Sequence, residues 1–442
     1  MESSTALATP PQAGSSSSSK AKTTTTAMTV SKVPGRTNMP DEAASNPHYV
    51  VKRGVVKGFK NPYPSFSNSV GFVSLFRNVV WPLLTGRLKR PDTRPPTVPV
   101  VKPEWLPGRR RDGPGKLRAT WLGHACYHVE FPSGLRVLFD PVFEDRCSPL
   151  AFMGPKRYTP RPCDLADIPV VDAVVISHSH YDHLSHASVL EIQRRHPRVH
   201  FFVGLGLEKW FRACGLNNVT ELDWWEDVDL TLRLGDEEEH DEGQQPQEGE
   251  AAAGGRRREA ISARISCLPC QHTSGRSVLD RDATLWCSWA VRSGDKSVWF
   301  GGDTGYRSVP RILAPLAGAT DDNRPVAADD SDYGPAHEAL PRCPQFQQIG
   351  ELRGPFDLGL IPIGAYRPRA AFSAVHADPH DAVDLFRDTR CAAALAMHWG
   401  TWALTLEDVL EPPRRLREAL ARRGIPETGV FDVCDIGESR EF

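Results

Sequence analysis

The chain of 442 residues lacks any run of about eighteen apolar residues, the length that a helix needs to cross a bilayer. Its start does not combine basic residues with an apolar stretch, as a secretory signal would. The ten cysteines are scattered, which argues against a disulfide-stapled secreted domain and for a reducing compartment. A formal net charge of -2 gives no general argument for nucleic-acid binding. We therefore expect an intracellular, globular protein of the soluble type.

The composition along the chain predicts three parts. Residues 1–45 are rich in Ser, Thr, Ala and Pro, which bury too little apolar area to fold, and we expect a disordered tail. A mitochondrial transit peptide can share that composition, but Arg is scarce there. Residues 46–116 form an N-terminal extension, and residues 117–442 read as one catalytic domain with regular strands and helices. Charged or polar stretches at 236–259 and 318–350 are expected to be mobile insertions.

The N-terminal extension contains a candidate membrane-interface segment. Residues 69–84 are mostly apolar, and residues 86–118 hold ten Lys and Arg against three acids. An apolar segment next to a basic one can bind a membrane surface, with its cations near anionic headgroups. The alternative is that 69–84 packs on the catalytic domain while the basic stretch is merely solvated. Both interpretations stay open on the sequence alone.

Apolar runs of strand length recur through the catalytic domain. They predict strands at 119–131, 135–140, 170–176, 199–204, 262–268, 285–291, 297–302, 357–363 and 392–397. Helices are expected over about 185–195 and 379–390. Asp378 can cap the second helix, and Pro379 suits its first position. The cysteine pair Cys267 and Cys270 has no second pair at zinc-finger spacing, so we place it on a buried strand leading to His272.

The segment Ser177-His178-Ser179-His180-Tyr181-Asp182-His183-Leu184 carries the strongest chemical signal. It follows a continuous β-branched run, so it lies at the carboxyl end of a buried strand. In extended backbone His178 and His180 point the same way and can bind one ion together. The chain then turns toward a helix, which directs Asp182 and His183 to a second position. Imidazole and carboxylate form a ligand set that zinc accepts.

Three further candidate ligands also come after strands: His272 after 262–268, Asp303 in VWFGGDTGY, and His398 in AALAMHWG. A single histidine after an apolar strand is more often a satisfied core residue. Seven such residues in this order favour a metal site instead. His124, in TWLGHA, can reach the same pocket, but a core histidine bonded to backbone is the favoured interpretation.

This ordered set resembles the metallo-β-lactamase superfamily. The resemblance implies an α/β fold in which an αββα sandwich of two mixed sheets, flanked by helices, holds two Zn²⁺ ions. His178, His180 and His272 would bind one ion, Asp182, His183 and His398 the other, and Asp303 would bridge them. Asp182 and Asp303 are thus the catalytic carboxylates. Asp140, which ends LRVLFD, matches the aspartate that supports the histidine loop.

Longer motifs narrow the resemblance. Over residues 60–440 the chain is similar to the N-acylphosphatidylethanolamine-hydrolysing phospholipase D family. The shared motifs are HSHYDHL, Gln271-His272, GDTGY, IPIGAY followed by Arg367-Pro368-Arg369, HADP, MHWGTW and LEPP. This implies hydrolysis of that phospholipid to phosphatidic acid and an N-acylethanolamine by a hydroxide bridging two zinc ions. Tyr181 and His376 match positions that contact the lipid. The alternatives are a ring packed beside the metal site for Tyr181 and a helix-entry residue for His376. The resemblance also implies a peripheral membrane location and pairing into a homodimer. The tail and both insertions depart from the family core.

Other functions remain open on the sequence. The superfamily hydrolyses lactones, thioesters and other phosphodiesters, so another ester or lactone is an alternative substrate. A nuclease is disfavoured because the catalytic region shows no long basic groove. A metal-free scaffold that binds only lipids or proteins is disfavoured because all seven ligand positions hold competent residue types. Histidine and carboxylate ligands also admit iron or manganese.

Overall fold

The structure is a computed structural model. It describes residues 27–36, 38–67, 81, 85–86, 89–106, 115–233, 260–277, 279–309 and 335–442. The predictions for residues 1–26, 236–259 and 318–334, and for all but Trp81 of 69–84, therefore lie outside the described residues. Among the helices that are described, none is long and apolar enough to pass through a bilayer.

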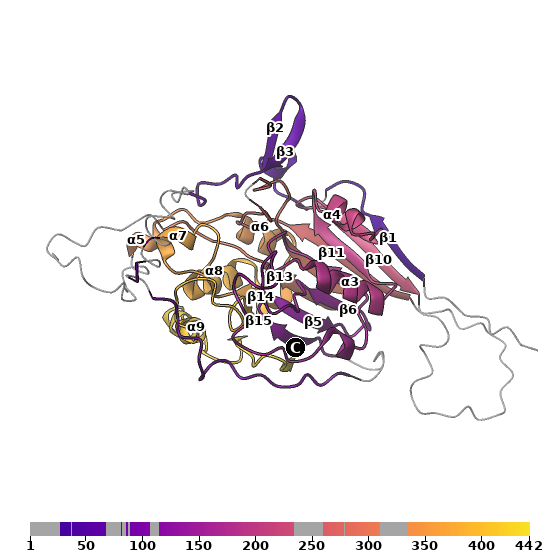
Figure 1. Cartoon of the computed structure of the whole chain (residues 1–442). Coiled ribbons are helices and arrows are strands. Elements are labelled where there is room, and N and C mark those ends of the chain that lie inside the picture. The colour runs from indigo at the N-terminus through magenta and orange to yellow at the C-terminus, as the bar shows by residue number, and fades with distance from the viewer. Residues whose placement is uncertain are drawn as a thin grey trace, which may run out of the picture.

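Two sheets form the centre of the molecule (Figure 1). The first has eight strands in the order β1-β10-β11-β12-β13-β14-β15-β16, antiparallel as far as β13 and parallel from there. Its strands are β1 (Ala27–Lys32), β10 (Asp227–Arg233), β11 (Ala260–Leu268), β12 (Ser288–Ser293), β13 (Lys296–Phe300), β14 (Phe356–Pro362), β15 (Cys391–Met397) and β16 (Phe431–Asp432).

The second sheet has seven strands in the order β17-β4-β5-β6-β7-β8-β9, antiparallel up to β6 and parallel beyond it. Its strands are β4 (Arg118–Gly123), β5 (Cys126–Glu130), β6 (Arg136–Phe139), β7 (Ala173–Val175), β8 (His200–Gly204), β9 (Val219–Leu222) and β17 (Ser439–Glu441). A separate hairpin, β2 (Tyr49–Lys52) and β3 (Val55–Phe59), stands out from the body.

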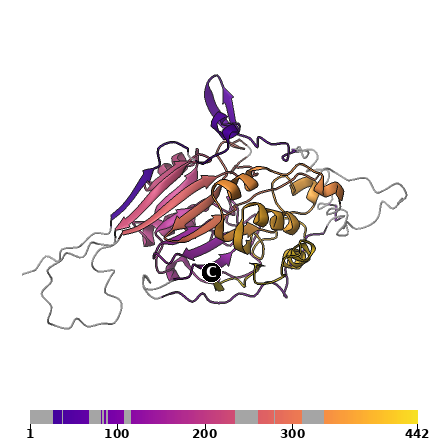
Figure 2. The same cartoon turned by 180° about the vertical axis from the view of Figure 1, so that it is seen from behind.

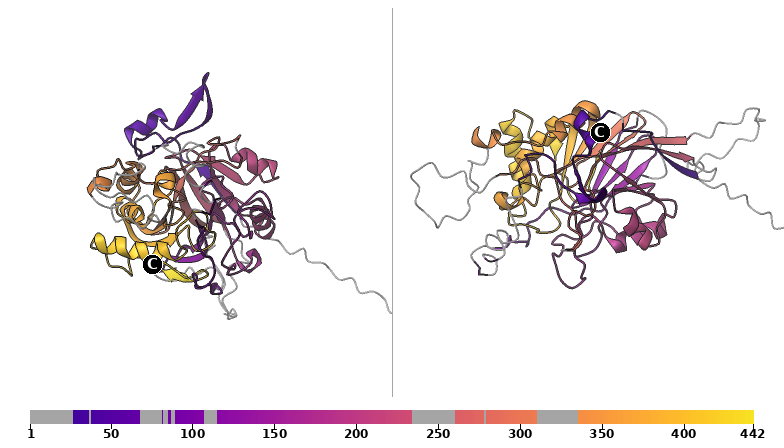
Figure 3. Two further views of the ribbon diagram at one scale, coloured as in Figure 1. Left: turned by 60° about the vertical axis from the view of Figure 1, so that its left-hand side comes forward. Right: turned by 90° about the horizontal axis from the view of Figure 1, so that it is seen from above.

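Helices cover the outer faces of both sheets (Figures 2 and 3). They are α3 (His186–Arg195), α4 (Glu208–Ala213), α5 (Pro335–Glu338), α6 (Gln345–Leu352), α7 (Arg369–Phe372), α8 (Pro379–Asp388) and α9 (Glu411–Arg422). Short 3-10 helices lie at Asp41–Ser45 and Leu165–Asp167. One core lies between the sheets, where the rings of Phe139 and Phe300 are 4.9 Å apart, and another lies beneath α3 and α4. This confirms the predicted αββα sandwich.

Strands β6, β7 and β8 explain why the central prediction succeeds. Every residue of β6 and β7 is buried, as strands covered on both faces must be, and such strands read as continuous apolar runs. Helix α8 begins as expected, with Pro379 in its first turn and the Asp378 side chain accepting a hydrogen bond from the amide of Asp381. It ends at Asp388, because Arg390 has a left-handed backbone (φ +57°).

Two strand predictions were wrong in detail. The run 119–131 is two antiparallel strands, β4 and β5, because the chain turns at His124, whose φ is +51°. The turn places His124 at the end of both strands. The strand expected from 285 begins at Ser288, and β9 and β10 were not predicted.

The expected disorder of residues 1–45 is wrong for the part that the structure describes. Strand β1 pairs with β10, and its apolar residues Met28 and Val30 face Leu232 and Leu230 across the ladder. An edge partner therefore supplies the order that these polar-rich residues cannot supply alone. Mobility through residue 350 is also wrong, since α6 buries Phe346 and Ile349 completely.

Candidate metal centre

The histidine-rich loop directly follows β7, at the carboxyl end of a buried parallel strand. The backbone turns back on itself because the amides of His183 and Leu184 both donate to the carbonyl of His180. Ser185 then caps α3 by accepting a hydrogen bond from the amide of Ser188. The turn and the cap fix the loop between strand and helix, so its side chains face the strand tips of the other sheet.

His272, Asp303 and His398 come from that other sheet, just beyond β11, β13 and β15 respectively. Gly302 has a left-handed backbone (φ +58°), and a Cβ there would lie 2.7 Å from the Cβ of Ser177. Only glycine permits this approach, which brings Asp303 up to the histidine loop. The structure thus brings together all seven residues that the sequence assigned to metal binding.

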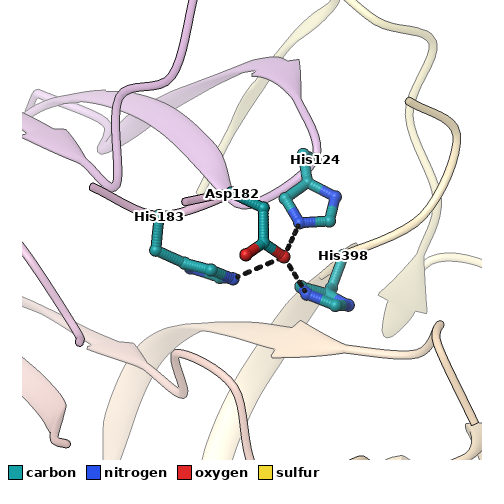
Figure 4. A group of neighbouring side chains, drawn as sticks. All are labelled: His124, Asp182, His183 and His398. Carbon is teal, nitrogen blue, oxygen red and sulfur yellow. Dashed lines mark hydrogen bonds and ion pairs between the residues drawn. The ribbon is translucent and has the colours of Figure 1, made fainter. Parts of the chain in front are cut away.

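The side chains form two clusters, and within each cluster the potential ligand atoms all lie within 4.8 Å of one another. The first contains His178, His180, His272 and Asp303, and the second contains His124, Asp182, His183 and His398 (Figure 4). The Asp303 carboxylate lies between them. Its Oδ1 is 3.1 Å from His183 Nε2 and 3.0 Å from His398 Nε2, and its Oδ2 is 3.6 Å from His272 Nε2. Its position is that of a bridging ligand.

The preferred interpretation of His124 was wrong. Its Nε2 lies 3.1 Å from Asp182 Oδ2 and its ring centroid 4.1 Å from that of His398, so the side chain belongs to the second cluster (Figure 4). The backbone explains how it arrives there, because the carbonyl of His124 accepts a hydrogen bond from the amide of His398. The turn between β4 and β5 is thereby joined to the strand tip of the other sheet. The glycine before it, Gly123, was the only sequence signal for this turn.

Hydrogen bonds determine which ring nitrogens face the clusters. The Ser177 hydroxyl donates its single proton to Asp140, so His178 Nδ1 must donate to Ser177 Oγ, at 2.9 Å. His183 Nδ1 donates to Asp140 Oδ2 at 2.6 Å, and His272 Nδ1 donates to the Val375 carbonyl at 2.8 Å. The Nε2 atoms of His178 and His272 therefore carry lone pairs. Three carboxylates, against the effect of burial, raise the pKa of His183 well above its usual range, so in the metal-free chain its Nε2 holds a proton that a cation would displace. Such hydrogen-bond partners orient metal-binding imidazoles.

This arrangement fits bound cations. His178 Nε2 and His272 Nε2 lie 2.8 and 3.2 Å from His180 Nδ1, so three acceptor-type nitrogens converge. The buried atoms His183 Nε2 and His398 Nε2 lie 3.1 and 3.0 Å from Asp303 Oδ1 as ion pairs. A cation that displaced the protons of the two rings would be bound by all three atoms. The donor set therefore suits a binuclear metal site.

Electrostatics couple the two clusters. Burial lowers the pKa of His178 and of His272 well below the usual range, and neighbouring histidines add to the effect, so both rings are neutral ligands. Burial opposes protonation of His398 as well, but Asp303 and Asp182 outweigh it and raise its pKa to about 9. His183 and His398 hold the pKa of Asp303 well below its usual range, against the effect of burial. The carboxylates are thus ionised, as metal ligands must be.

Asp140 supports both clusters, as expected. One oxygen accepts from the Ser177 amide at 2.7 Å, and the other accepts from His183 Nδ1 and the Ser177 hydroxyl. It therefore orients His183 directly and His178 through Ser177, one histidine in each cluster.

Replacement of Asp140 by asparagine is expected to weaken zinc binding about 10- to 100-fold, because an amide cannot fix both tautomers as a carboxylate does. Competition with a coloured chelator measures this. A matched variant, Asp357→Asn, removes a carboxylate that bonds Ser297 where β13 and β14 begin, at the opposite strand ends from the clusters, and its zinc affinity should be unchanged. Equal affinity of both variants would refute the orienting role.

The two residues expected to bind substrate lie beside the clusters. The Tyr181 ring is stacked beneath the Arg276 guanidinium, 3.9 Å from its carbon to the ring centroid. His376 Nδ1 lies 3.9 Å from Asp303 Oδ2, and this histidine forms a third group with Asp303 and His398. Its proximity to two metal-ligand candidates was not evident from its position shortly before α8. The substrate roles remain predictions. Cys267 and Cys270 are buried and outside these groups, on and just after β11.

Comparison with known proteins places this site in a family. The family model described as "Beta-lactamase superfamily domain" matches residues 135–321. The N-acyl-phosphatidylethanolamine-hydrolyzing phospholipase D 1 of Caenorhabditis elegans is 35% identical over 73% of this chain and 75% of its own length. The mitochondrial N-acyl-phosphatidylethanolamine-hydrolyzing phospholipase D of Saccharomyces cerevisiae is 30% identical over 73% of this chain and 55% of its own length. An uncharacterized Mycobacterium tuberculosis protein is 33% identical over 78% and 73%.

Among solved structures, a metallo hydrolase from the archaeon Ignicoccus hospitalis is similar with a TM-score of 0.43 and 20% identity, over 74% of this chain and 98% of its own. Several hydrolases are named among the similar proteins, and this chain holds two clusters suited to a binuclear metal centre. It is therefore a metal-dependent hydrolase that belongs to the metallo-β-lactamase superfamily and, within it, to the family of the N-acyl-phosphatidylethanolamine-hydrolyzing phospholipases D.

Proposed function

We propose that the protein is a phospholipase D-type phosphodiesterase that hydrolyses N-acylphosphatidylethanolamine to phosphatidic acid and an N-acylethanolamine. Two findings together carry the proposal. The relatives are named for this reaction, and the Asp303 carboxylate lies between two histidine clusters. A phosphodiester needs a nucleophile at phosphorus and positive charge near its oxygens. Both needs are met by a binuclear metal centre.

Two zinc ions, when bound, would supply a hydroxide at neutral pH and a Lewis acid for the phosphoryl oxygens. The chain's own residues prepare the site for that chemistry. Asp140 and the Val375 carbonyl hold ring protons on Nδ1, so that Nε2 of His183 and His272 faces inward. Asp303 and Asp182 balance the cationic charge, and burial of the clusters keeps water from screening it.

Tyr181 and His376 are proposed to position the lipid. His376 lies within reach of the phosphate that the site would hold, since its Nδ1 is 3.9 Å from the central carboxylate. That nitrogen is buried and makes no hydrogen bond to the described residues, so it is available to a ligand. Tyr181 offers its hydroxyl while its ring is held by Arg276.

If the substrate is a membrane lipid, the enzyme must also act at a membrane surface. We propose a peripheral, intracellular location, with the segment 69–84 and the following basic residues as an anchor. Pairing into a homodimer remains a prediction from the family. Targeting of the chain to mitochondria by its Ser- and Thr-rich start likewise remains a prediction.

Incubation of the purified protein with N-acylphosphatidylethanolamine, followed by mass spectrometry of the products, tests the proposal. Phosphatidic acid and free N-acylethanolamine are the expected products. Release of an N-acylated lysolipid would contradict this function. Hydrolysis of only a lactone or another ester, offered in parallel, would instead support the alternative that the protein is a hydrolase of such a substrate. Well under one metal ion per chain, with no turnover of any substrate, would favour a binding scaffold.

A further inference from the structure

Most of the large apolar side chains that the described part of the chain exposes lie in three short segments. These are the β2–β3 hairpin, the loop 147–156 and the loop 273–282, which expose Val51, Val55, Val56, Phe152, Met153 and Leu279. Leu279 is 94% exposed, Phe152 79% and Val51 55%. Scattered exposed apolar residues are ordinary, but their concentration in a few neighbouring segments marks an interaction surface.

All three segments adjoin the metal centre. At the root of the hairpin, the Phe59 amide donates to the Asp282 carbonyl at 2.8 Å, and Asn61 Nδ2 donates to the His272 carbonyl at 2.7 Å. The hairpin is therefore fixed to the loop 273–282, which itself continues from His272. On the side of the second cluster, the segment that leads into the loop 147–156 is held by Trp402, whose Nε1 donates to the Asp145 carbonyl. The Trp402 ring lies 4.9 Å from that of His124.

The hairpin combines apolar and cationic groups in a form that suits a bilayer surface. Residues 51–57 are all exposed and read Val-Lys-Arg-Gly-Val-Val-Lys, with three valines, three cations and no acid. Arg53 and Gly54 form a two-residue turn with φ of 53° and 75°, so the tip is tight. The hairpin projects from the body in Figures 1 and 2. Apolar side chains at its tip can enter the headgroup boundary while the cations meet anionic phosphates.

A protein partner is a weaker explanation. A strand that paired with the hairpin would use backbone groups along one edge, and it would leave Phe152, Met153 and Leu279 exposed. A bilayer surface, in contrast, can contact several projecting segments at once. The three cations at Lys52, Arg53 and Lys57 also select an anionic surface over a neutral one.

We propose that residues 49–59, 147–156, 273–277 and 279–282 form a lipid-contacting rim that seats the metal centre against an anionic membrane. The rim shares no residue with the segment 69–84. The inference rests on the proposed function only in that a membrane lipid must reach the site. Binding of the rim to vesicles needs no turnover, so the two proposals can fail independently.

Sedimentation of the full chain with vesicles of phosphatidylcholine and phosphatidylserine, without N-acylated lipid, tests the rim. The triple variant Val51→Thr, Val55→Thr, Val56→Thr keeps β-branched side chains but adds hydroxyls, and its affinity for these vesicles should fall about tenfold or more. The matched variant Val101→Thr alters an exposed valine outside the rim and should bind as the wild type does. Equal binding of the triple variant and the wild type would overturn the proposal.

A second measurement uses the unaltered chain. Trypsin cleaves after Lys52, Arg53 and Lys57, and mass spectrometry can follow the new peptide ends. Vesicles containing phosphatidylserine should slow these cleavages about tenfold, and phosphatidylcholine alone should slow them less, because the cations lose their attraction. Cleavage at the same rate with and without vesicles would overturn the rim. If vesicles protected the hairpin but no N-acylethanolamine was ever released, the rim would stand and the proposed substrate would not.

Discussion

Replacement of Asp303 by asparagine should lower kcat/KM for the N-acylated lipid about a thousandfold or more. The carboxylate touches both clusters, with Oδ1 facing His183 and His398 and Oδ2 facing His178 and His272. The amide has nearly the same shape, so packing is retained. It lacks the negative charge that balances two cations, and it places an N–H group beside imidazole nitrogens that need an acceptor or a metal. Steady-state kinetics and metal analysis of the same sample measure both effects.

The control for this variant is Asp229→Asn, which removes an exposed carboxylate paired with Arg264 on the neighbouring strand. A surface pair of this kind contributes little to stability, so the control should keep both activity and metal. Circular dichroism should be the same for both proteins. If Asp303→Asn retained two metal ions and near-normal turnover, Asp303 would not bridge the clusters.

Much of the site was predictable because strand ends are visible in the sequence. The apolar run before Ser177 indicated a buried strand, and the residues just after a buried parallel strand lie at one edge of its sheet. The same reasoning applied to His272, Asp303 and His398, each just beyond an apolar run. Ligand type and position relative to strands are local properties, which is why one sequence sufficed to assemble seven candidates.

The features that escaped prediction depend on contacts between distant segments. The turn at His124 interrupts a run that reads as one strand, and its position is fixed by the His398 amide 274 residues later. Strand β1 is ordered by pairing with β10, and nothing in its own composition favours order. His376 reaches Asp303 because its loop, 373–376, packs on the His272 segment: the Val375 carbonyl accepts from His272 Nδ1 and the Ala374 carbonyl from Gln271 Nε2. Such pairings have no local signature.

Removal of the metal with a chelator is expected to abolish hydrolysis, and added Zn²⁺ should restore it. The loss should be as large as the assay can measure, because the proposed reaction takes its nucleophile from the metal centre and requires no serine or cysteine. The apo protein should also melt at a lower temperature, since a ligand that binds only the folded chain stabilises it. Measuring activity and Tm before chelation, after it and after adding back the metal tests both effects. Full activity with no detectable metal would contradict the assignment.

The pH dependence of that rebinding depends on His398 and on His183, because carboxylates, against the effect of burial, also raise the pKa of His183 well above its usual range. In the metal-free chain Asp303 and Asp182 raise the pKa of His398 from 6.5 to about 9, against the effect of burial, so at neutral pH an entering zinc ion must displace a proton. Zinc affinity should therefore rise by up to about tenfold per pH unit toward pH 9, with proton release visible by calorimetry in buffers of different ionisation heat.

The stability of the apo form should change in the opposite direction. Its protonated His398 stabilises the fold fully below pH 6.5, and that contribution, roughly 3 kcal/mol, is lost as pH rises through about 9. In His398→Gln, which cannot hold that proton, both trends should weaken, and the part that His183 contributes should remain. Zinc binding without proton release in the wild type would mean that the imidazole is already neutral, and that the two carboxylates do not act on it as their distances imply.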